Sequence, residues 1–480
     1  MVHDAEKLGD TRPSFTRRTP SRVGRFPGAR YDAPRLLAYG FWNGKPIQRE
    51  GHLPENPKAR IQGLPVEDIV DEFGTPLFIY DAHVLRETFR RISAALPDGV
   101  EVLYSLKANP NISVCGFLGA QGAGAEVSSL TELMTAVRAG VDPADIIFLG
   151  PGKSRADLEA CVSAGISAVV CESLAELRLL DEVAAARGAT PFPAVLRVNP
   201  SFHSKGSGLS MGGKPRQFGV DEEEVRRARP LLDALEHVEV KGFHAYMGTR
   251  FLDHRDVVAN TESILRMAED LATELGVDLS FVDFGGGLGV AYFENESDLD
   301  TAELGKGMRG PVDDFRARHP SCRIIMELGR FLAADAGLYV TRAVYVKESM
   351  GELFVVADGG TNHHMAAVGI GSFVKRNFPV VHLGSPSAEP TGTYTVTGPL
   401  CTPNDTLVKK VRLPEVRPGD LLGIERSGAY GPTASPGLFL GHGYPAEVFV
   451  HDGQVTLVRE RDTPEELLSR QRLAVFEDAS

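Results

Sequence analysis

Disulfide frameworks and long apolar segments are both absent from this sequence of 480 residues. It has five cysteines, an odd number without a CxxC pair, so their spacing supports neither a disulfide framework nor a zinc ribbon. Their scarcity fits a reducing, cytoplasmic location. No apolar run approaches the roughly 18 residues that cross a membrane, and the first residues lack the apolar core of a secretory signal.

The sequence also lacks an excess of basic residues, which argues against nucleic-acid binding. It has 51 Lys and Arg against 64 Asp and Glu, for a net charge of −13. Residues 11–30 are the exception, because they contain six arginines and no acidic residue. We expect residues 1–30 to form a disordered basic arm, since early acidic residues and prolines disfavour the alternative of a transit peptide.

The apolar pattern predicts two domains of different kinds. Between residues 76 and 327, short β-branched runs alternate with helical segments, and PLFIY (76–80) is the first candidate strand. Eight or nine such units in about 250 residues predict a (β/α)8 barrel or, alternatively, a large doubly wound sheet. After Arg330 the period becomes 2, which predicts a mostly antiparallel β domain. The expected parts are an N-terminal segment packing with the β domain (31–75), the barrel (76–330) and the β domain (331–480).

Lys107 stands in YSLKANPN, at the predicted carboxyl end of a barrel strand. That end of a (β/α)8 barrel carries the active site. A partly desolvated lysine there has a lowered pKa and can form a Schiff base with an aldehyde. The alternative is an ordinary exposed lysine at the start of a loop.

Two further motifs follow later barrel strands. FGGGLG (284–289) can bring backbone N–H groups close to a phosphate, although Val290 rules out a GxGxxG dinucleotide motif. MELGR (326–330) places Glu327 and Arg330 on the same rim as Lys107. The carboxylate could hold a heteroaromatic nitrogen protonated, and the guanidinium could bind the phosphate. The alternatives are a flexible turn and a surface ion pair.

The β domain holds two candidate sites. Cys401 in GPLCTPND could act as an acid, a base or a nucleophile, or be a small buried core residue. His363 and His364 are adjacent and point to opposite faces of a strand, so they form a poor metal pair. We expect no metal, and a zinc hydrolase using these histidines is a weakly supported reading.

Together, a strand-end lysine, a glycine-rich phosphate loop and an acidic partner for a ring nitrogen are what a pyridoxal 5'-phosphate enzyme needs. At this point the chain resembles the fold type III pyridoxal-phosphate decarboxylases, which include diaminopimelate and ornithine decarboxylases. The resemblance runs from TPLFIYD (75–81) to GHGYPAEV (441–448), and GFHAYMGT, DGG and SGAYG also occur in the order found in that family. It implies a (β/α)8 barrel with a C-terminal β domain and a homodimer with shared active sites.

The resemblance also implies roles for individual residues. Lys107 would carry the cofactor, Glu327 would pair with its ring nitrogen, and Arg197 would lie behind them. Cys401 and Asp405 would reach the active site of the other subunit, with Cys401 catalytic. The phosphate would be bound by Gly285, Gly286, Gly287 and Arg330, helped by Thr249 and Tyr430, and Gly329 would also bind the cofactor. The substrate would be bound by Arg376, Thr402, Asp405 and His363.

Two departures from that family pattern bear on the substrate. Tyr246 stands where most members stack a histidine on the cofactor ring, and His244 matches an earlier histidine of the motif. An aromatic ring can still stack, but the proton chemistry of imidazole is lost. Thr402 stands where diaminopimelate decarboxylases carry a glutamate that contacts the far amine of the substrate, which argues against free diaminopimelate.

CTPND, KRNFP (375–379) and MGGKPRQFG (211–219) resemble the branch of the butirosin-pathway glutamyl-carrier-protein decarboxylase. We therefore expect decarboxylation of an amino acid held on an acyl-carrier protein or in an amide, within a specialised biosynthetic pathway. The alternatives are a decarboxylase of free diaminopimelate, lysine or ornithine, and a catalytically silent paralogue. The basic arm could meet an acidic carrier protein.

Overall fold

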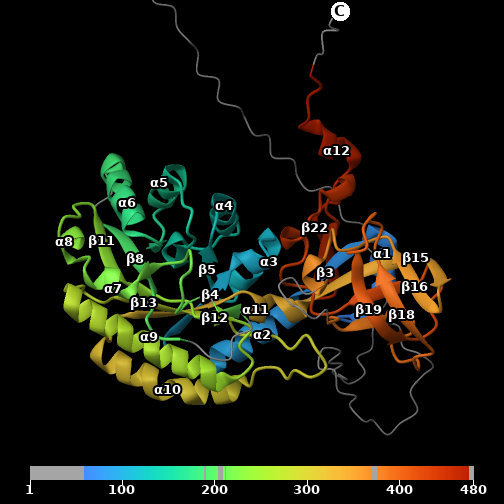
Figure 1. The fold of residues 1–480 in the computed structure, drawn as a ribbon, viewed down its shortest axis with the longest axis horizontal. Coiled ribbons are helices and arrows are strands. Elements are labelled where there is room, and N and C mark those ends of the chain that lie inside the picture. Colours follow the sequence, from blue (N-terminus) through green and yellow to red (C-terminus); the bar gives the residue numbers. More distant parts are fainter. Residues whose placement is uncertain (1–58, 189–190, 204–208, 211, 369–375, 475–480) are drawn as a thin grey trace, which may run out of the picture. The chain divides into compact units, whose positions relative to one another are not determined.

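The structure is a computed structural model that describes residues 59–474, apart from 189–190, 204–208, 211 and 369–375. The predicted basic arm and residues 31–58 lie outside the described residues. The described chain forms a barrel of parallel strands and a second, mostly antiparallel sheet (Figure 1).

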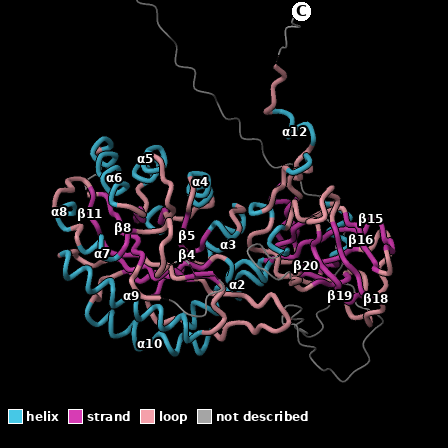
Figure 2. The backbone as a smooth tube through the Cα atoms, viewed as in Figure 1, coloured by secondary structure: helices cyan, strands magenta, loops and turns pink. Residues whose placement is uncertain are grey.

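Within the described residues, eight parallel strands close into a barrel in the order β4-β5-β6-β7-β8-β11-β13-β14 and back to β4. Figure 2 shows the helices on the outside of these strands. The interior is packed with branched side chains such as Ile147, Val170 and Ile325, each with no exposed surface. The barrel prediction is confirmed, and the doubly wound sheet is wrong. The strands are β4 (Val100–Ser105), β5 (Gly124–Val127), β6 (Ile146–Phe148), β7 (Ala168–Cys171), β8 (Phe192–Asn199), β11 (Val238–His244), β13 (Phe281–Gly286) and β14 (Arg323–Leu328).

The barrel helices begin and end at residues suited to those positions. Ser154 and Asp157 form a reciprocal capping box at the start of α5, and Gly165 ends that helix in the left-handed conformation. The long helices α9 and α10 pack against each other (Figure 1). The helices are α2 (Ala82–Ala95), α3 (Ile112–Ala120), α4 (Leu130–Arg138), α5 (Arg155–Ala164), α6 (Leu174–Arg187), α7 (Glu222–Arg226), α8 (Arg229–Leu232), α9 (His254–Leu275), α10 (Thr301–Arg318) and α11 (Arg330–Ala333).

The first candidate strand is not a barrel strand. Residues Leu77–Asp81 form β3, which pairs antiparallel with β15 (Gly337–Ser349) and parallel with β21 (Ala446–His451). All five residues of β3 are buried. The expectation that 76–80 open the barrel is therefore wrong, because this apolar run is the centre of the second sheet.

The remaining strands of the second sheet come from the part of the chain after Arg330, as predicted. The sheet order is β19-β18-β16-β15-β3-β21-β22, with β20 pairing to β15 and β17. Most pairings are antiparallel, while β16 and β18 run parallel. These strands are β16 (Glu352–Ala357), β17 (Val380–His382), β18 (Gly392–Thr397), β19 (Thr406–Leu413), β20 (Leu421–Ile424) and β22 (Gln454–Arg459).

The segment before β3 contacts the second sheet. Ala59 donates its N–H to Leu383 O at 3.1 Å, and Gln62 Nε2 donates to Val450 O at 2.9 Å. This segment holds β1 (Arg60–Ile61), β2 (Leu64–Pro65) and α1 (Val66–Phe73). None of the helices in the described residues is both long and apolar enough to cross a membrane.

Candidate active site

Lys107 follows β4 directly, in the short 3-10 helix η1 (Leu106–Ala108), so it lies at the carboxyl end of the barrel. Its Nζ donates to Oε2 of Glu126 at 2.7 Å, and Oε1 of Glu126 accepts the Ser128 hydroxyl at 2.9 Å. The Lys107 side chain is 37% exposed, whereas the Glu126 side chain is 0% exposed. Desolvation lowers the pKa of Lys107, but the charges of Glu126 and Glu327 raise it by more. The arrangement therefore favours a cationic lysine, and the expectation of a lowered pKa at Lys107 is wrong because the two carboxylates outweigh the desolvation.

Glu327, on β14, is 2% exposed and faces the barrel interior. His244 Nε2 lies 3.5 Å from its Oε1. Burial raises the pKa of Glu327, but His244, Lys107 and Arg197 together lower it below its usual range. Arg197 is itself oriented by Glu172, which accepts from its Nη1 at 2.7 Å. Glu327 is thus an ionised carboxylate inside the barrel.

Arg330 begins α11, and its guanidinium lies 4.5 Å from the ring centroid of Tyr430 and 5.6 Å from that of Tyr292. Nη1 donates to the Tyr292 hydroxyl at 3.1 Å, while the buried Nε has no hydrogen-bond partner among the described residues. A buried guanidinium N–H without an acceptor is suited to bind an anion. The small space beside it is also lined by Thr249, Gly287 and Gly329.

The three glycines of the glycine-rich turn differ in their conformations and in their contacts. Gly285 and Gly287 have φ angles of 65° and 81°, and a Cβ on Gly286 would come within 1.8 Å of the backbone oxygen of Glu327. Gly285 donates its N–H to Asp283 Oδ1 at 2.8 Å. Gly287 lines the space beside Arg330, whereas Gly285 and Gly286 do not. The latter two therefore shape the turn instead of lining that space.

A cavity of about 570 Å³ connects these groups. It fits the three functional groups of pyridoxal 5'-phosphate. Lys107 is placed for the aldehyde, Arg330 offers its unpartnered Nε to the phosphate, and both carboxylate oxygens of Glu327 lack hydrogen-bond partners among the described residues. Tyr246 lines the same cavity, with its ring centroid 5.9 Å from the Lys107 Nζ.

Of the candidate residues of the β domain, Tyr430 lines this cavity, whereas Cys401, Thr402, Asp405, Arg376 and His363 do not. Cys401 is exposed, in contrast to the other four cysteines, which are buried, and all five are free. Thr402 accepts the Asn404 N–H on its hydroxyl at 3.3 Å. Arg376 donates to Asn295 Oδ1 at 3.3 Å and lies over the ring of Phe293.

Asp405 and His363 lie in the interior of the β domain. Asp405 is 2% exposed and accepts the N–H of Thr361 and that of Leu400, both at 2.7 Å. His363 Nε2 lies 3.1 Å from Gly443 O, and burial lowers the pKa of His363 to about 4. Both polar groups are thus engaged inside the domain, and their predicted contact with substrate remains a prediction.

Several residues of the site were not assigned a role from the sequence. Glu126, Asp283 and His244 are fully buried on β5, β13 and β11. Glu126 could have been identified from its place near the carboxyl end of β5, the strand next to that of Lys107. Ser128, Phe218 and residues 150–153 also line the cavity.

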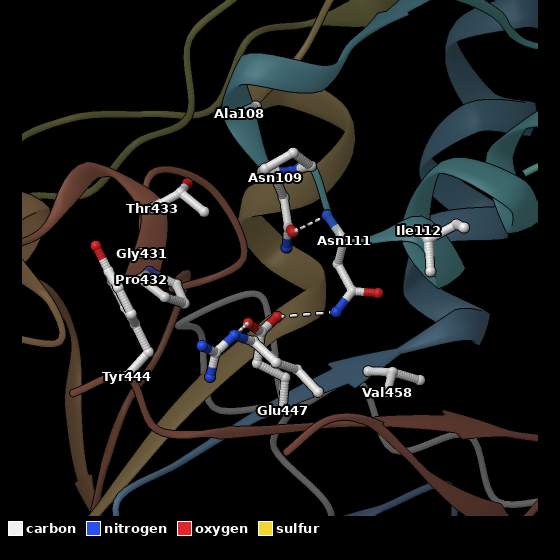
Figure 3. A pocket seen from close by; sticks show the side chains of 12 residues that line it. Ala108, Asn109, Asn111, Ile112, Gly431, Pro432, Thr433, Tyr444, Glu447 and Val458 are labelled. Carbon is white, nitrogen blue, oxygen red and sulfur yellow. Dashed lines mark hydrogen bonds and ion pairs between the residues drawn. The ribbon is translucent and has the colours of Figure 1, made fainter. Parts of the chain in front are cut away.

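A second cavity, of about 450 Å³, is lined in part by residues 108–112 (Figure 3). Its buried acid, Glu447, accepts from the Tyr80 hydroxyl at 2.9 Å and from Asn111 Nδ2 at 3.0 Å. Arg459 Nε lies 3.8 Å from the other carboxylate oxygen. The carboxylate of Glu447 therefore already has protein partners, whereas buried atoms of Glu327 and Arg330 in the Lys107 cavity have none among the described residues.

Comparisons with known proteins show which family the chain is similar to. A family model for the pyridoxal-binding domain of pyridoxal-dependent decarboxylases matches residues 82–334. The L-glutamyl-[BtrI acyl-carrier protein] decarboxylase of Niallia circulans is 35% identical over 84% of this chain and 95% of its own length. The diaminopimelate decarboxylase of Aquifex aeolicus is 30% identical, over 84% of this chain and 93% of its own. The crystal structure of the Helicobacter pylori diaminopimelate decarboxylase with L-lysine has a TM-score of 0.76 at 28% identity and covers 84% of this chain and 98% of that one.

Proposed function

The chain belongs to the pyridoxal-dependent decarboxylases, and we propose that its substrate is an amino acid attached to an acyl-carrier protein. The observation that carries this proposal is the 35% identity with a carrier-protein decarboxylase over 84% of the chain. The α-carboxylate must be free in order to leave as CO2. The attachment therefore uses a side-chain carboxyl group, and a glutamyl group is the substrate class that fits.

The cavity supports a tethered substrate. Free diaminopimelate, lysine and ornithine carry a distal ammonium group, which needs an acidic partner when it is desolvated. Besides Glu327, the one acid among the residues that line the cavity is Asp157, whose Oδ2 already accepts the N–H of Ser154. Thr402, which follows Cys401, supplies no charge. The lining also includes the cation Lys153 and the small or uncharged residues Ser128, Ser129, Leu130, Gly150, Pro151 and Gly152.

Each side chain of the site has its own role in the proposed reaction. Pyridoxal 5'-phosphate, when bound, supplies an aldehyde that links to amines and a ring that accepts the electron pair left by the departing CO2. Lys107 would hold the aldehyde group, and Glu126 would hold the Lys107 ammonium group whenever the lysine is free. Glu327 keeps the ring nitrogen protonated, and Arg330 binds the phosphate. Lys107 is also placed to return a proton to Cα.

We infer a homodimer in which Cys401 of the partner subunit completes the site. Cys401 is exposed and lies outside the cavity of its own chain. Beside the cavity, α4 exposes an apolar stripe of Leu130, Met134 and Val137, at 37%, 44% and 43% exposure. An apolar stripe at helical spacing is suited to burial by another protein surface. A second copy of this chain would cover the stripe and bring a thiol to the substrate.

The proposed function is tested by CO2 release. Purified wild-type enzyme is given a carrier protein that bears a side-chain-linked glutamyl group, and separately free glutamate, diaminopimelate, lysine and ornithine. We expect release from the carrier-bound substrate and none from the Lys107→Ala variant. Release from a free diamino acid alone would overturn the carrier proposal and leave the decarboxylase assignment intact.

A further inference from the structure

Asp283 is a fully buried carboxyl group to which the mechanism above gives no role. It lies on β13, between β11 and β14, and is paired in register with His244. One oxygen or ring nitrogen from each of Asp283, His244 and Glu327 lies within 4.8 Å of the others. The three side chains therefore form one cluster, inside the barrel at the predicted position of the cofactor ring nitrogen.

The two oxygens of Asp283 have different surroundings. Oδ1 accepts the N–H of Gly285 at 2.8 Å, whereas Oδ2 has no hydrogen-bond partner among the described residues. Both oxygens of Glu327 are buried and likewise lack such partners in the described part of the chain. Two buried carboxyl groups this close cannot both ionise without strong repulsion. A proton held between them removes the repulsion and gives Oδ2 a hydrogen bond.

Neighbouring charges decide which carboxyl group carries that proton. His244 Nε2 is 3.5 Å from Glu327 Oε1, and Lys107 and Arg197 also stabilise the negative charge of Glu327. For Asp283, burial and the charge of Glu327 raise the pKa well above its usual range, against the lowering effect of the Gly285 N–H. The proton therefore belongs on Asp283.

We propose that Asp283 is a positioning residue for Glu327: its protonated carboxyl group donates a hydrogen bond to Glu327 while accepting the N–H of Gly285. The proposal rests on the role of Glu327 at the ring nitrogen. Asp283 then links that carboxylate to the glycine turn beside Arg330, so the contacts at the ring nitrogen and at the phosphate are held in one geometry.

Asparagine tests this proposal because its amide imitates a protonated aspartic acid, with an oxygen to accept and an N–H to donate. We expect Asp283→Asn to bind pyridoxal 5'-phosphate within about 3-fold of wild type, and Asp283→Ala to bind it about 10- to 100-fold more weakly, as for other supporting residues of this kind. In Glu327→Gln, adding Asp283→Ala should cause little further loss, since its partner is already altered.

The measurement is the cofactor dissociation constant, from absorbance of the lysine-linked cofactor, with no substrate present. A wrong substrate assignment therefore leaves this result unaffected. Asp181→Asn is the matched control, because Asp181 accepts the N–H groups of His237 and Val238 at the opposite end of β11. It should leave cofactor binding unchanged.

Two outcomes would overturn the proposal. If Asp283→Asn binds the cofactor as weakly as Asp283→Ala, the position requires a negative charge. If Asp283→Ala binds the cofactor as tightly as wild type, Asp283 does not position Glu327. Should the alanine variant fail to fold, an infrared difference spectrum of wild type against Asp283→Asn decides instead: it must contain the carbonyl stretch of a protonated carboxyl group, and its absence contradicts the proposal.

Discussion

The Nζ of Lys107 lies 2.7 Å from Oε2 of Glu126, a carboxylate with no exposed side-chain surface. The contact gives the free lysine a fixed place and a counter-charge at the end of neighbouring strands β4 and β5. The reaction repeatedly frees this amine and binds it again. We expect Glu126 to fix the position of the free lysine and to raise its pKa.

Glu126→Gln should impair turnover more than cofactor binding. The amide keeps the size of the side chain and loses the charge that raises the pKa of Lys107. We expect kcat to fall by about 100-fold, the lower end of effects on proton transfer. The pH at which the cofactor links to Lys107 should fall, as followed by absorbance. An unchanged pH dependence in this variant would contradict the role of Glu126.

Tyr246 should act through its ring and not through its hydroxyl. Burial raises the pKa of Tyr246 to about 12, so the phenol stays neutral through the working range. Tyr246→Phe should keep kcat within about 3-fold, because an aromatic face remains for stacking. Tyr246→His should add an inflection to the pH profile near pH 6.5, the ordinary pKa of histidine. A loss of about 100-fold in Tyr246→Phe would show that the hydroxyl takes part in the chemistry.

Gly286→Ala should distort the site although the φ angle of Gly286 is not positive. The added Cβ would come within 1.8 Å of the backbone oxygen of Glu327, so β13 and β14 must separate locally. We expect weaker cofactor binding and a lower Tm. Gly310→Ala is the control, because a Cβ there meets no atom within 4 Å. Equal Tm and cofactor affinity in the two variants would contradict this packing.

His363 should contribute to the pH dependence of stability and not to substrate binding. Burial lowers its folded-state pKa to about 4, below the roughly 6.5 of an unfolded chain. Between these values the unfolded state binds more protons, so stability is lost as pH falls from about 6.5 to about 4. The difference in unfolding free energy between wild type and His363→Gln should shrink by about 1.4 kcal/mol per pH unit on acidification.

Chemical unfolding at several pH values measures that slope. Above pH 7 the two proteins should keep a constant difference in stability, and KM should be the same for both. A raised KM with no change of slope would instead place His363 at the substrate, as the family resemblance implies.

Subunit mixing tests the shared active site. Cys401→Ala and Lys107→Ala should each lose at least about 100-fold in kcat, the scale of a lost proton donor. Co-expressed together, they form mixed dimers in which one of the two sites is intact, so about a quarter of wild-type activity should return.

The control pairs Lys107→Ala with a chain that carries both substitutions, and this mixture should stay inactive because every site lacks the lysine. If the original mixture also stays inactive while both variants dimerise, Cys401 does not act across subunits.

The barrel and the β domain were predictable because local apolar periodicity differs between them. Residues 76–80 misled the prediction because a fully buried strand has the same apolar pattern in either kind of sheet. Its neighbours in the sheet, β15 and β21, are far away in the sequence. Only the fold reveals which sheet such a strand joins.

The site was predictable where chemistry and strand ends coincide, as for Lys107, Glu327 and Arg330. Glu126 and Asp283 were not, since one carboxylate in an apolar run has no distinctive pattern. Their roles depend on partners that meet only when the barrel closes: Glu126 is 19 residues from Lys107 in sequence and 2.7 Å away in space. The burial that shifts pKa values likewise exists only in the folded chain.

A competition experiment tests the central claim most directly. Wild-type enzyme is given equal concentrations of side-chain-linked glutamyl carrier protein and free diaminopimelate, and mass spectrometry follows the loss of CO2 from each. We expect kcat/KM for the carrier-bound substrate to exceed that for the free amino acid by at least about 100-fold, a difference that recognition of the carrier can supply. Equal or faster decarboxylation of free diaminopimelate would contradict the account.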